Sequence, residues 1–330
     1  MNDSLQSLGP EGKGTGSNPS AVIELNRILA PVDFSPASSR GLVIAARVAE
    51  WFHSKLDLIY VIEPPSLPEW GYAYLEIREA NLRKSAEEKL QVFPMECGID
   101  PRLVRSEKIR SGEAEYEICQ AAIDERADLI VLASHGLGGF KHALIGSTCE
   151  RVVRRAPCPV LTVRESTLAK NGIADFAPRR ILVTTDFSEA SKKAFSYAVA
   201  LARRFEASLM LVYVVPSHLP TELSHLGIIL QEQRILSEAR EQLPLFRRSE
   251  IDPHIHIETL VLNGNPQYEI CKTAATHGTD LIIMSTRGNT GLKRQAIGSV
   301  TERVVRHAPC AVLVVREREH GTMDHLLSMP

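Results

Sequence analysis

Glycine and serine residues recur in this sequence at a spacing that suits the binding of an anion. In two places, nine residues separate a glycine from a Gly-Ser pair: Gly136 from Gly146-Ser147, and Gly288 from Gly298-Ser299. Glycine lets a backbone approach phosphate oxygens closely, and a helix N-terminus offers free N–H groups with a favourable dipole. A single Gly-Ser pair favours a tight turn before a capped helix, with no ligand. The repeated gap favours two phosphate loops, in which the serines donate a hydroxyl and cap the helix.

Acidic residues and further glycines stand at the ends of other apolar runs. Asp33 and Asp186 close the first apolar run in each half of the chain, and Gly112 and Gly264 follow the third. Ligands of open α/β sheets bind beyond the carboxyl ends of the strands, where the strand order reverses. Together with the glycine loops, these residues therefore predict one ligand site in each half.

The two halves are copies of one another. Residues 145–164 align with residues 297–316 at an offset of 152, and 15 of these 20 positions are identical. Near the start of each copy, Ile28–Pro36 aligns with Ile181–Glu189 at an offset of 153. Each repeat has about 140 residues, which is long enough for a hydrophobic core of its own. The sequence therefore predicts two tandem domains.

Within each repeat, short apolar runs alternate with longer segments of helical periodicity. This alternation predicts a doubly wound α/β domain, a parallel sheet with helices on both faces. The strands are expected at Arg27–Val32, Lys55–Ile62, Leu103–Ile109, Asp128–Ala133 and Val160–Val163, and again at Ile181–Thr185, Ser208–Val215, His256–Val261, Asp280–Ser285 and Val312–Val315. The helices of the first repeat are expected at Ala37–Phe52, Tyr72–Phe93, Glu113–Glu125 and Thr148–Arg155.

Composition excludes several classes of protein. The 330 residues carry 38 Lys and Arg against 40 Asp and Glu, so no bulk positive charge is available for nucleic acid. The sequence contains no run of 18 apolar residues, so it predicts no membrane-spanning helix. Residues 1–20 lack the apolar centre of a signal peptide. We therefore expect a cytoplasmic protein with neither membrane nor nucleic-acid partners. The six cysteines form no CxxC pair and no metal-binding spacing with histidine, so they are expected in the core.

These motifs resemble the universal stress protein family in its tandem two-domain form. The nucleotide motif of that family is Gly, two residues, Gly, nine residues, Gly, then Ser or Thr. The first repeat matches it from Ala133 to Ser147 and the second from Ser285 to Ser299, except that the leading glycine is alanine or serine. The resemblance covers both repeats. It implies five parallel strands per domain in the order 3-2-1-4-5, with a nucleotide between strands 1 and 4.

The resemblance also implies an ATP site in each repeat. The aspartates would lie near the adenosine, the backbone at the end of the second strand would contact the adenine edge, and the glycine loop would hold the phosphates. In the first repeat these positions are Pro31, Asp33, Val61, Gly112, Ala133, Gly136, Gly146, Ser147 and Thr148. In the second repeat they are Thr184, Asp186, Val214, Gly264, Ser285, Gly288, Gly298, Ser299 and Val300.

Three functions remain open at this stage. The chain is a stress-response or regulatory protein that binds ATP, ADP or AMP, or it is a scaffold that binds no nucleotide, or it hydrolyses ATP slowly. No acid–base pair, nucleophile or metal-binding carboxylate cluster recurs near the loops, so we expect no catalytic residues and no protein metal site. Mg²⁺ bound with the nucleotide stays open. Tyr116 and Tyr268, at matching positions, are expected to pack in the core or a groove.

The domain plan and the assembly follow from the same pattern. Residues 1–22 and 318–330 are expected to be tails, and residues 166–177 a linker between domains at 23–165 and 178–317. The last strands, Pro159–Val163 and Ala311–Val315, are apolar and expected at sheet edges, which favours their pairing. We expect the two repeats to form an intramolecular pseudo-dimer through these strands. A further homodimer stays open.

Overall fold

The computed structural model describes residues 23–63, 72–134, 146–164, 176–216, 226–249, 255–286 and 297–316. The strands of the first repeat are β1 (Arg27–Pro31), β2 (Lys55–Ile62), β3 (Val104–Ser111), β4 (Leu129–Ala133) and β5 (Val160–Val163). Its helices are α1 (Pro36–Phe52), α2 (Tyr72–Glu96), α3 (Ala114–Asp124) and α4 (Ser147–Arg155), with a short 3-10 turn at Pro101–Leu103.

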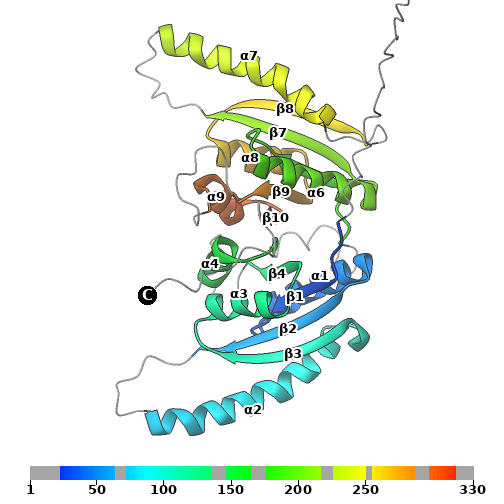
Figure 1. The fold of residues 1–330 in the computed structure, drawn as a ribbon, viewed down its shortest axis with the longest axis vertical. Helices are drawn as coiled ribbons and strands as arrows, with labels where there is room; N and C mark the ends of the chain where they lie inside the picture. Colours follow the sequence, from blue (N-terminus) through cyan, green and yellow to red (C-terminus); the bar gives the residue numbers. More distant parts are fainter. Residues whose placement is uncertain are drawn as a thin grey trace, which may run out of the picture.

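The second repeat has the same order of elements. Its strands are β6 (Arg180–Thr184), β7 (Ser208–Pro216), β8 (Ile257–Gly264), β9 (Leu281–Ser285) and β10 (Ala311–Val315). Its helices are α6 (Glu189–Phe205), α7 (Leu226–Ser249), α8 (Pro266–Thr276) and α9 (Ser299–His307). Figure 1 shows the two repeats stacked along the long axis, each with a long outer helix, α2 or α7.

The ten strands form one sheet in the order β3-β2-β1-β4-β5-β10-β9-β6-β7-β8. Within each repeat the strands are parallel and their order is 3-2-1-4-5, which confirms the predicted fold class. The chain order reverses between β1 and β4 and between β6 and β9. Each repeat therefore has one switch point, where a ligand can lie beyond the carboxyl ends of two strands.

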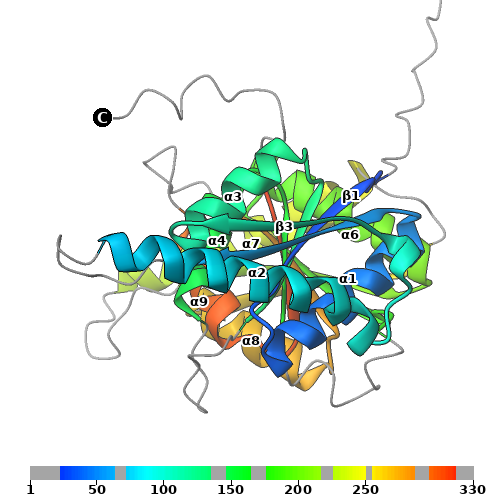
Figure 2. The same ribbon diagram turned by 90° about the horizontal axis from the view of Figure 1, so that it is seen from below.

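The two repeats meet at their last strands. Leu161 lies opposite Leu313 in an antiparallel pairing of β5 with β10. All residues of both strands are buried. The pairing removes two apolar edges that would otherwise be open to other chains. The helices α4 and α9 lie side by side across this junction, as both ribbon views show (Figures 1 and 2).

Helix ends in both repeats are set by the same local chemistry. Ser35 begins α1 by accepting a hydrogen bond from the Ser38 N–H, and Ser188 begins α6 by accepting one from the Ser191 N–H. Such a serine satisfies one of the N–H groups that a helix start leaves without an intrahelical acceptor. The four helices α1, α2, α6 and α7 cover one face of the sheet, and α3, α4, α8 and α9 cover the other.

Burial agrees with most of the sequence-based expectations and corrects one. The six cysteines are free thiols; four are buried, whereas Cys97 and Cys271 are half-buried. Tyr116 and Tyr268 are 57% and 60% exposed, so the expectation that they pack in the core or a groove is wrong. Each stands two residues after the start of α3 or α8, on the outward side of the helix, whereas Ile118 and Ile270 face the sheet. Within the described residues, no helix is long and apolar enough to cross a membrane.

Candidate functional site

Each candidate site begins at the turn that follows the first strand of the repeat. Asp33 Oδ1 accepts a hydrogen bond of 3.0 Å from the Ser35 N–H. Asp186 Oδ1 accepts one of 3.2 Å from the Ser188 N–H and a second, of 2.6 Å, from the Ser188 hydroxyl. These bonds hold two half-buried carboxylates at the strand ends beside β4 and β9. An aspartate that bonds the backbone two residues on is a common way to fix a tight turn.

The residue after each aspartate has an unusual backbone conformation. Phe34 and Phe187 lie in the left-handed region, with φ of 61° and 64°. A side chain in this region costs roughly 1–2 kcal/mol per residue, so the surrounding packing must hold it. The Phe34 ring stacks on Tyr60 and the Phe187 ring packs on Tyr213, with ring centroids 4.7 Å apart in both pairs. The same strained turn is therefore present at both switch points.

The two ends of each glycine loop are tied to the sheet. The Gly146 N–H donates to the Ser134 carbonyl over 2.6 Å, and the Ser134 N–H donates to the Val163 carbonyl over 2.8 Å. In the second repeat, Gly298 bonds Thr286 and Thr286 bonds Val315, over 2.7 and 3.0 Å. These bonds place the starts of α4 and α9 at the ends of β4 and β9. Gly136 and Gly288 lie outside the described residues.

The start of each loop helix differs from the expectation in one respect. Gly146 and Gly298 are the N-cap residues, with extended backbones and no side-chain capping bond. Ser147 and Ser299 are the first residues inside the helices, and both are exposed. The expectation that these serines cap the helices is therefore wrong, because the capping position lies one residue earlier. Since glycine has no side chain, the N-cap residue itself does not compete with a ligand for the first-turn N–H groups.

The position before each loop carries a small side chain for a packing reason. A side chain on Gly41 of α1 would come within 3.1 Å of the Ala133 nitrogen, so the helix approaches the end of β4 closely. Ser285, at the end of β9, is buried, and its carbonyl accepts a 2.9 Å hydrogen bond from the Thr301 hydroxyl. In the first repeat, the close approach of α1 therefore favours the small side chain of Ala133 where the family motif has its leading glycine.

Gly112 and Gly264 follow or end the third strand and are required by backbone conformation. Their φ values are 148° and 145°, which side-chain-bearing residues rarely adopt. A side-chain carbon at Gly112 would lie 3.0 Å from the Glu117 carboxylate, and one at Gly264 would lie 3.1 Å from the Glu269 stem. The Gly112 N–H donates to the Ile62 carbonyl at the end of β2. Each glycine therefore lies beside the carboxyl end of the second strand of its repeat.

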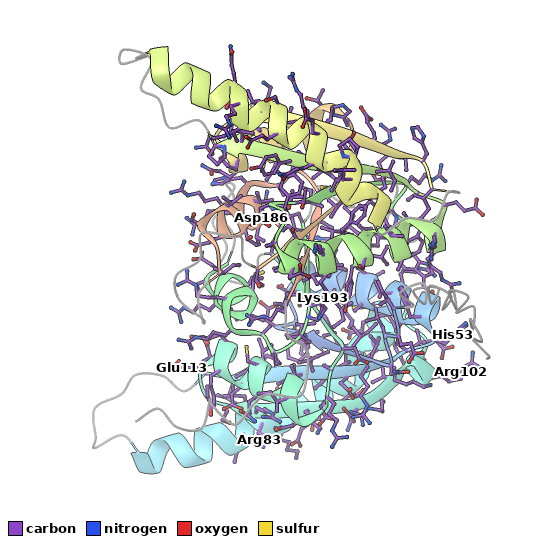
Figure 3. The ribbon with its side chains drawn as sticks, turned by 45° about the horizontal axis from the view of Figure 1, so that its top comes forward. His53, Arg83, Arg102, Glu113, Asp186 and Lys193 are labelled. Atoms are coloured by element: carbon purple, nitrogen blue, oxygen red, sulfur yellow. The ribbon has the colours of Figure 1, made fainter. Side chains whose placement is uncertain are left out.

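The remaining predicted residues lie along the same edge of the sheet. Pro31 and Thr184 end β1 and β6, Val61 and Val214 stand near the ends of β2 and β7, and Thr148 and Val300 follow the first residues of α4 and α9. In Figure 3, Glu113, which follows β3, lies on the side of α4, whereas His53 and Arg102 lie on the opposite side of the same repeat. The described residues from the prediction therefore gather at the carboxyl ends of the strands.

Electrostatics distinguish one aromatic residue at the second site. Burial raises the pKa of Tyr213, and the negative charge of Asp186 raises it further. The Tyr213 hydroxyl thus keeps its proton and can donate a hydrogen bond at neutral pH. Among the described residues, no group of three or more His, Cys, Asp or Glu side chains is arranged to hold a metal ion.

Some residues of these sites were missed by the sequence analysis. Phe34 and Phe187 and their partners Tyr60 and Tyr213 form an aromatic wall beside the aspartates. The Asp-Phe-Ser triplet, identical in both repeats at Asp33 and Asp186, was the available signal. Periodicity gave no indication of the left-handed phenylalanine, because this conformation depends on local hydrogen bonds rather than on apolar spacing.

Comparison with known proteins agrees with this architecture. The Universal stress protein family matches twice, over residues 24–164 and 178–316. Universal stress protein MJ0531 of Methanocaldococcus jannaschii is 36% identical over 143 residues, which are 42% of this chain and 82% of that protein. A universal stress protein of Mycolicibacterium smegmatis is 27% identical over 295 residues, which are 88% of this chain and 97% of that protein.

Solved structures show that the fold of this chain is similar to that of universal stress proteins. The crystal structure of a universal stress protein from Archaeoglobus fulgidus matches with a TM-score of 0.58 at 21% identity, covering 88% of this chain and 96% of that one. Because the family matches both repeats and relatives of tandem length align along nearly the whole chain, this protein belongs to the universal stress protein family.

Proposed function

We propose that this protein binds ATP, or another adenine nucleotide, at the carboxyl ends of β1 and β4 and of β6 and β9. One observation carries the proposal. In both repeats a hydrogen bond from the N-cap glycine ties the start of a helix to the strand end, on the same edge of the sheet as a turn-held aspartate. An uncapped helix start suits the phosphates, because its N–H groups and dipole favour negative charge.

The parts of the site divide between the nucleoside and the phosphates. Asp33 and Asp186 would accept hydrogen bonds from the ribose hydroxyls, since ionised carboxylates act only as acceptors. The backbone at Val61 and Val214 would face the adenine edge. Gly146-Ser147 and Gly298-Ser299 would bind phosphate oxygens through N–H groups and the exposed hydroxyls. The loops between Gly136 and Gly146 and between Gly288 and Gly298 would complete the phosphate site.

We also propose that the repeats at 23–165 and 178–317 are two domains, joined by residues 166–177, that form an intramolecular pseudo-dimer. The antiparallel pairing of β5 with β10 supports this assembly. Within it, nucleotide occupancy would set the conformation or the interactions of a regulatory stress-response protein. Binding rather than turnover is the proposed role, because the site offers positioned acceptors and amides but no recurring acid–base pair.

Calorimetric titration with ATP tests the binding sites one at a time. We expect two sites in the wild type, one in Gly146→Val or Gly298→Val, and none in the double variant. Valine adopts the extended backbone of these N-cap residues, with φ of −63° and −66°, so the fold should survive while the side chain blocks the phosphates. Circular dichroism and thermal unfolding are the controls for folding.

The outcome that contradicts the proposal is equally specific. If the folded double variant binds ATP with the stoichiometry of the wild type, the loops are structural turns. If the wild type neither binds ATP, ADP or AMP nor releases nucleotide on denaturation, as followed by mass spectrometry, the scaffold function replaces ours.

A further inference from the structure

The helices that carry the two candidate phosphate sites end on arginines of the opposite repeat. Arg316, directly after β10 in the second repeat, donates to the carbonyls of Val153 and Arg154 in α4, over 3.3 and 2.5 Å. Arg164, directly after β5 in the first repeat, donates to the Ala308 carbonyl over 2.7 Å and to the Arg306 carbonyl. The two arginines occupy matching positions, and both donate to the matching carbonyls of Arg154 and Arg306, so the contact is approximately two-fold symmetric.

These hydrogen bonds complete the helices. The last four carbonyls of a helix have no intrahelical donor, and a cation there also interacts favourably with the helix dipole. Helix α4 has only nine residues, from Ser147 to Arg155, and Val153 and Arg154 lie in its last turn. The same short helix starts at Gly146, where the phosphates are proposed to bind. An arginine that holds its end therefore also fixes the direction of its start.

Ion pairs add a second link between the two helices. Glu150, in the first turn of α4, pairs with Arg306 in the last turn of α9 over 2.7 Å. Glu302, in the first turn of α9, pairs with Arg154 in the last turn of α4 over 3.1 Å. These side chains are 24–44% exposed, so salt weakens their attraction. The bonds from Arg164 and the bond from Arg316 to Val153 are part-buried, so salt screens them less than the exposed ion pairs.

The position of each arginine makes the contact informative. The carbonyls of Val163 and Val315, the residues just before Arg164 and Arg316, accept the hydrogen bonds that begin the glycine loops of their own repeats. In the chain, Arg316 is thus adjacent to the second site. Its side chain nevertheless reaches the helix of the first site.

We propose that Arg316 is a positioning residue for the nucleotide site of the first repeat and Arg164 for that of the second, so that each site depends on a residue of the other repeat. This inference rests on the proposed nucleotide binding. It gives the tandem arrangement a role at the sites, because a single repeat lacks the donor that holds its own phosphate helix.

Variants with one working site test the crossed pattern. The Gly298→Val background leaves the first site and the Gly146→Val background leaves the second, and Arg316→Met and Arg164→Met are placed in each. ATP titration should give about fivefold weaker binding or more at the first site in Arg316→Met, with the second within about twofold of its background. Arg164→Met should give the reverse. Lysine at either position should restore part of the affinity, since it keeps one donor and the charge.

Arg204→Met is the matched control. Arg204 also donates to a carbonyl of the opposite repeat, that of Trp51, but at the end of α1 rather than of α4 or α9. It should leave both sites unchanged. If Arg316→Met weakens the second site, weakens both sites equally or weakens neither, the inference is overturned.

Hydrogen exchange of the nucleotide-free protein separates this inference from the proposed function. Arg316→Met should speed exchange in α4 more than in α9, and Arg164→Met should do the opposite. A wild type that neither binds ATP, ADP or AMP nor releases nucleotide on denaturation would end the proposed function, and exchange would then decide whether the arginines still hold the opposite helices. Uniform or uncrossed changes in exchange would overturn that positioning.

Discussion

The two repeats keep the same backbone geometry around their candidate sites but surround it with different side chains. The left-handed Phe34 and Phe187, the tied loop ends and the positive-φ glycines occur in both. The third residue of the helix that follows each loop, in contrast, is the buried Cys149 in one repeat and the buried Thr301 in the other. The two repeats thus share their backbone turns and backbone hydrogen bonds, whereas different side chains, such as Cys149 and Thr301, fill the buried space next to them.

The largest difference lies between the second and third strands. In the first repeat the register shifts between Leu56 and Asp57. The buried Asp57 accepts a hydrogen bond from the Ser106 hydroxyl and forms an ion pair with the Arg105 guanidinium over 2.8 Å. Arg105 also binds the buried Glu125. In the second repeat Met210 stands opposite Glu258 in an uninterrupted register. The first repeat therefore stabilises buried charge at a place where its copy uses an apolar side chain.

The two outer strands of the sheet differ in the same direction. The edge strand β3 carries Arg105, Lys108 and Arg110, and each of them pairs with a carboxylate. The edge strand β8 carries half-buried Leu260 and Leu262 instead. Charged residues protect a sheet edge from pairing with other chains. The charge network of β3 is therefore a property of one repeat rather than a requirement of the fold.

Replacing Arg105 should have the largest effect on stability. Arg105→Met leaves Asp57 and Glu125 with less compensation for their burial, and breaking such a buried pair costs roughly 3–5 kcal/mol. Because 35% of the Arg105 side chain is exposed, we expect a loss of about 2 kcal/mol in the free energy of unfolding, measured by urea denaturation.

Two further variants sharpen this test. Adding Asp57→Met, which introduces the side chain of the second repeat, should recover at least about half of the loss, because it removes the uncompensated charge. Arg47→Met removes an exposed pair with Glu50 and should change stability by less than about 0.5 kcal/mol. A loss as small as this in Arg105→Met would mean that the buried carboxylates need no partner.

Much of the fold could be predicted from the sequence because both of its signals are local. Alternation of apolar runs with helical periodicity located the strands with errors of a few residues at their ends, as at β8, where His256–Val261 was expected and Ile257–Gly264 is observed. The extra length of β8 arises from pairing with β7 up to Gly264, which apolar spacing cannot indicate.

The site was accessible to sequence reasoning only in part. Aspartates and glycines could be identified as candidate site residues, because these residue types serve few purposes at the end of a strand. Arg164 and Arg316 did not, since their partners are backbone carbonyls of the other repeat and their role depends on the antiparallel pairing of β5 with β10. Side-chain contacts across a pseudo-two-fold axis leave no spacing pattern within one repeat.

The glycines after the third strands should differ in their tolerance of a side chain. Gly112→Ala and Gly264→Ala both force alanine into a disfavoured backbone, at about 1–2 kcal/mol. The Gly112 variant should lose about 0.5 kcal/mol more, because Glu117, the neighbour of the new methyl group, is held by Arg110 at 3.5 Å. In the second repeat, Leu262 occupies the register position that Arg110 occupies in the first. Since leucine cannot form an ion pair with Glu269, that side chain can move away from the new methyl group more easily.

Gly98→Ala is the control for this pair in denaturation experiments. Gly98 has a φ of 71°, and a side-chain carbon there would meet nothing within 4 Å. Its loss of stability therefore measures backbone strain alone. Equal losses at Gly112 and Gly264 would show that the Arg110 pair does not restrain Glu117.

The smallest effect is expected at the buried helix position that differs between the repeats. Thr301→Cys should lose about 1 kcal/mol at pH 7, because the hydroxyl bond to the Ser285 carbonyl is replaced by a weak S–H donor. Cys149→Thr should lie within about 0.5 kcal/mol of the wild type at pH 7, since threonine is the residue that fits the second repeat.

Alkaline pH separates these two variants further. Burial raises the pKa of Cys149 to about 12, from an ordinary value of 9.0, so the folded protein keeps a proton that the unfolded chain loses above pH 9. The neutral thiol's contribution is therefore complete below pH 9 and falls as the pH rises, by up to about 1.4 kcal/mol per pH unit. We therefore expect the free energy of unfolding to fall less steeply with pH in Cys149→Thr and more steeply in Thr301→Cys than in the wild type. Urea denaturation at several pH values between 8 and about 10 measures this slope. Identical slopes in both variants would mean that water reaches the thiol and that the two helix positions are not equivalent in burial.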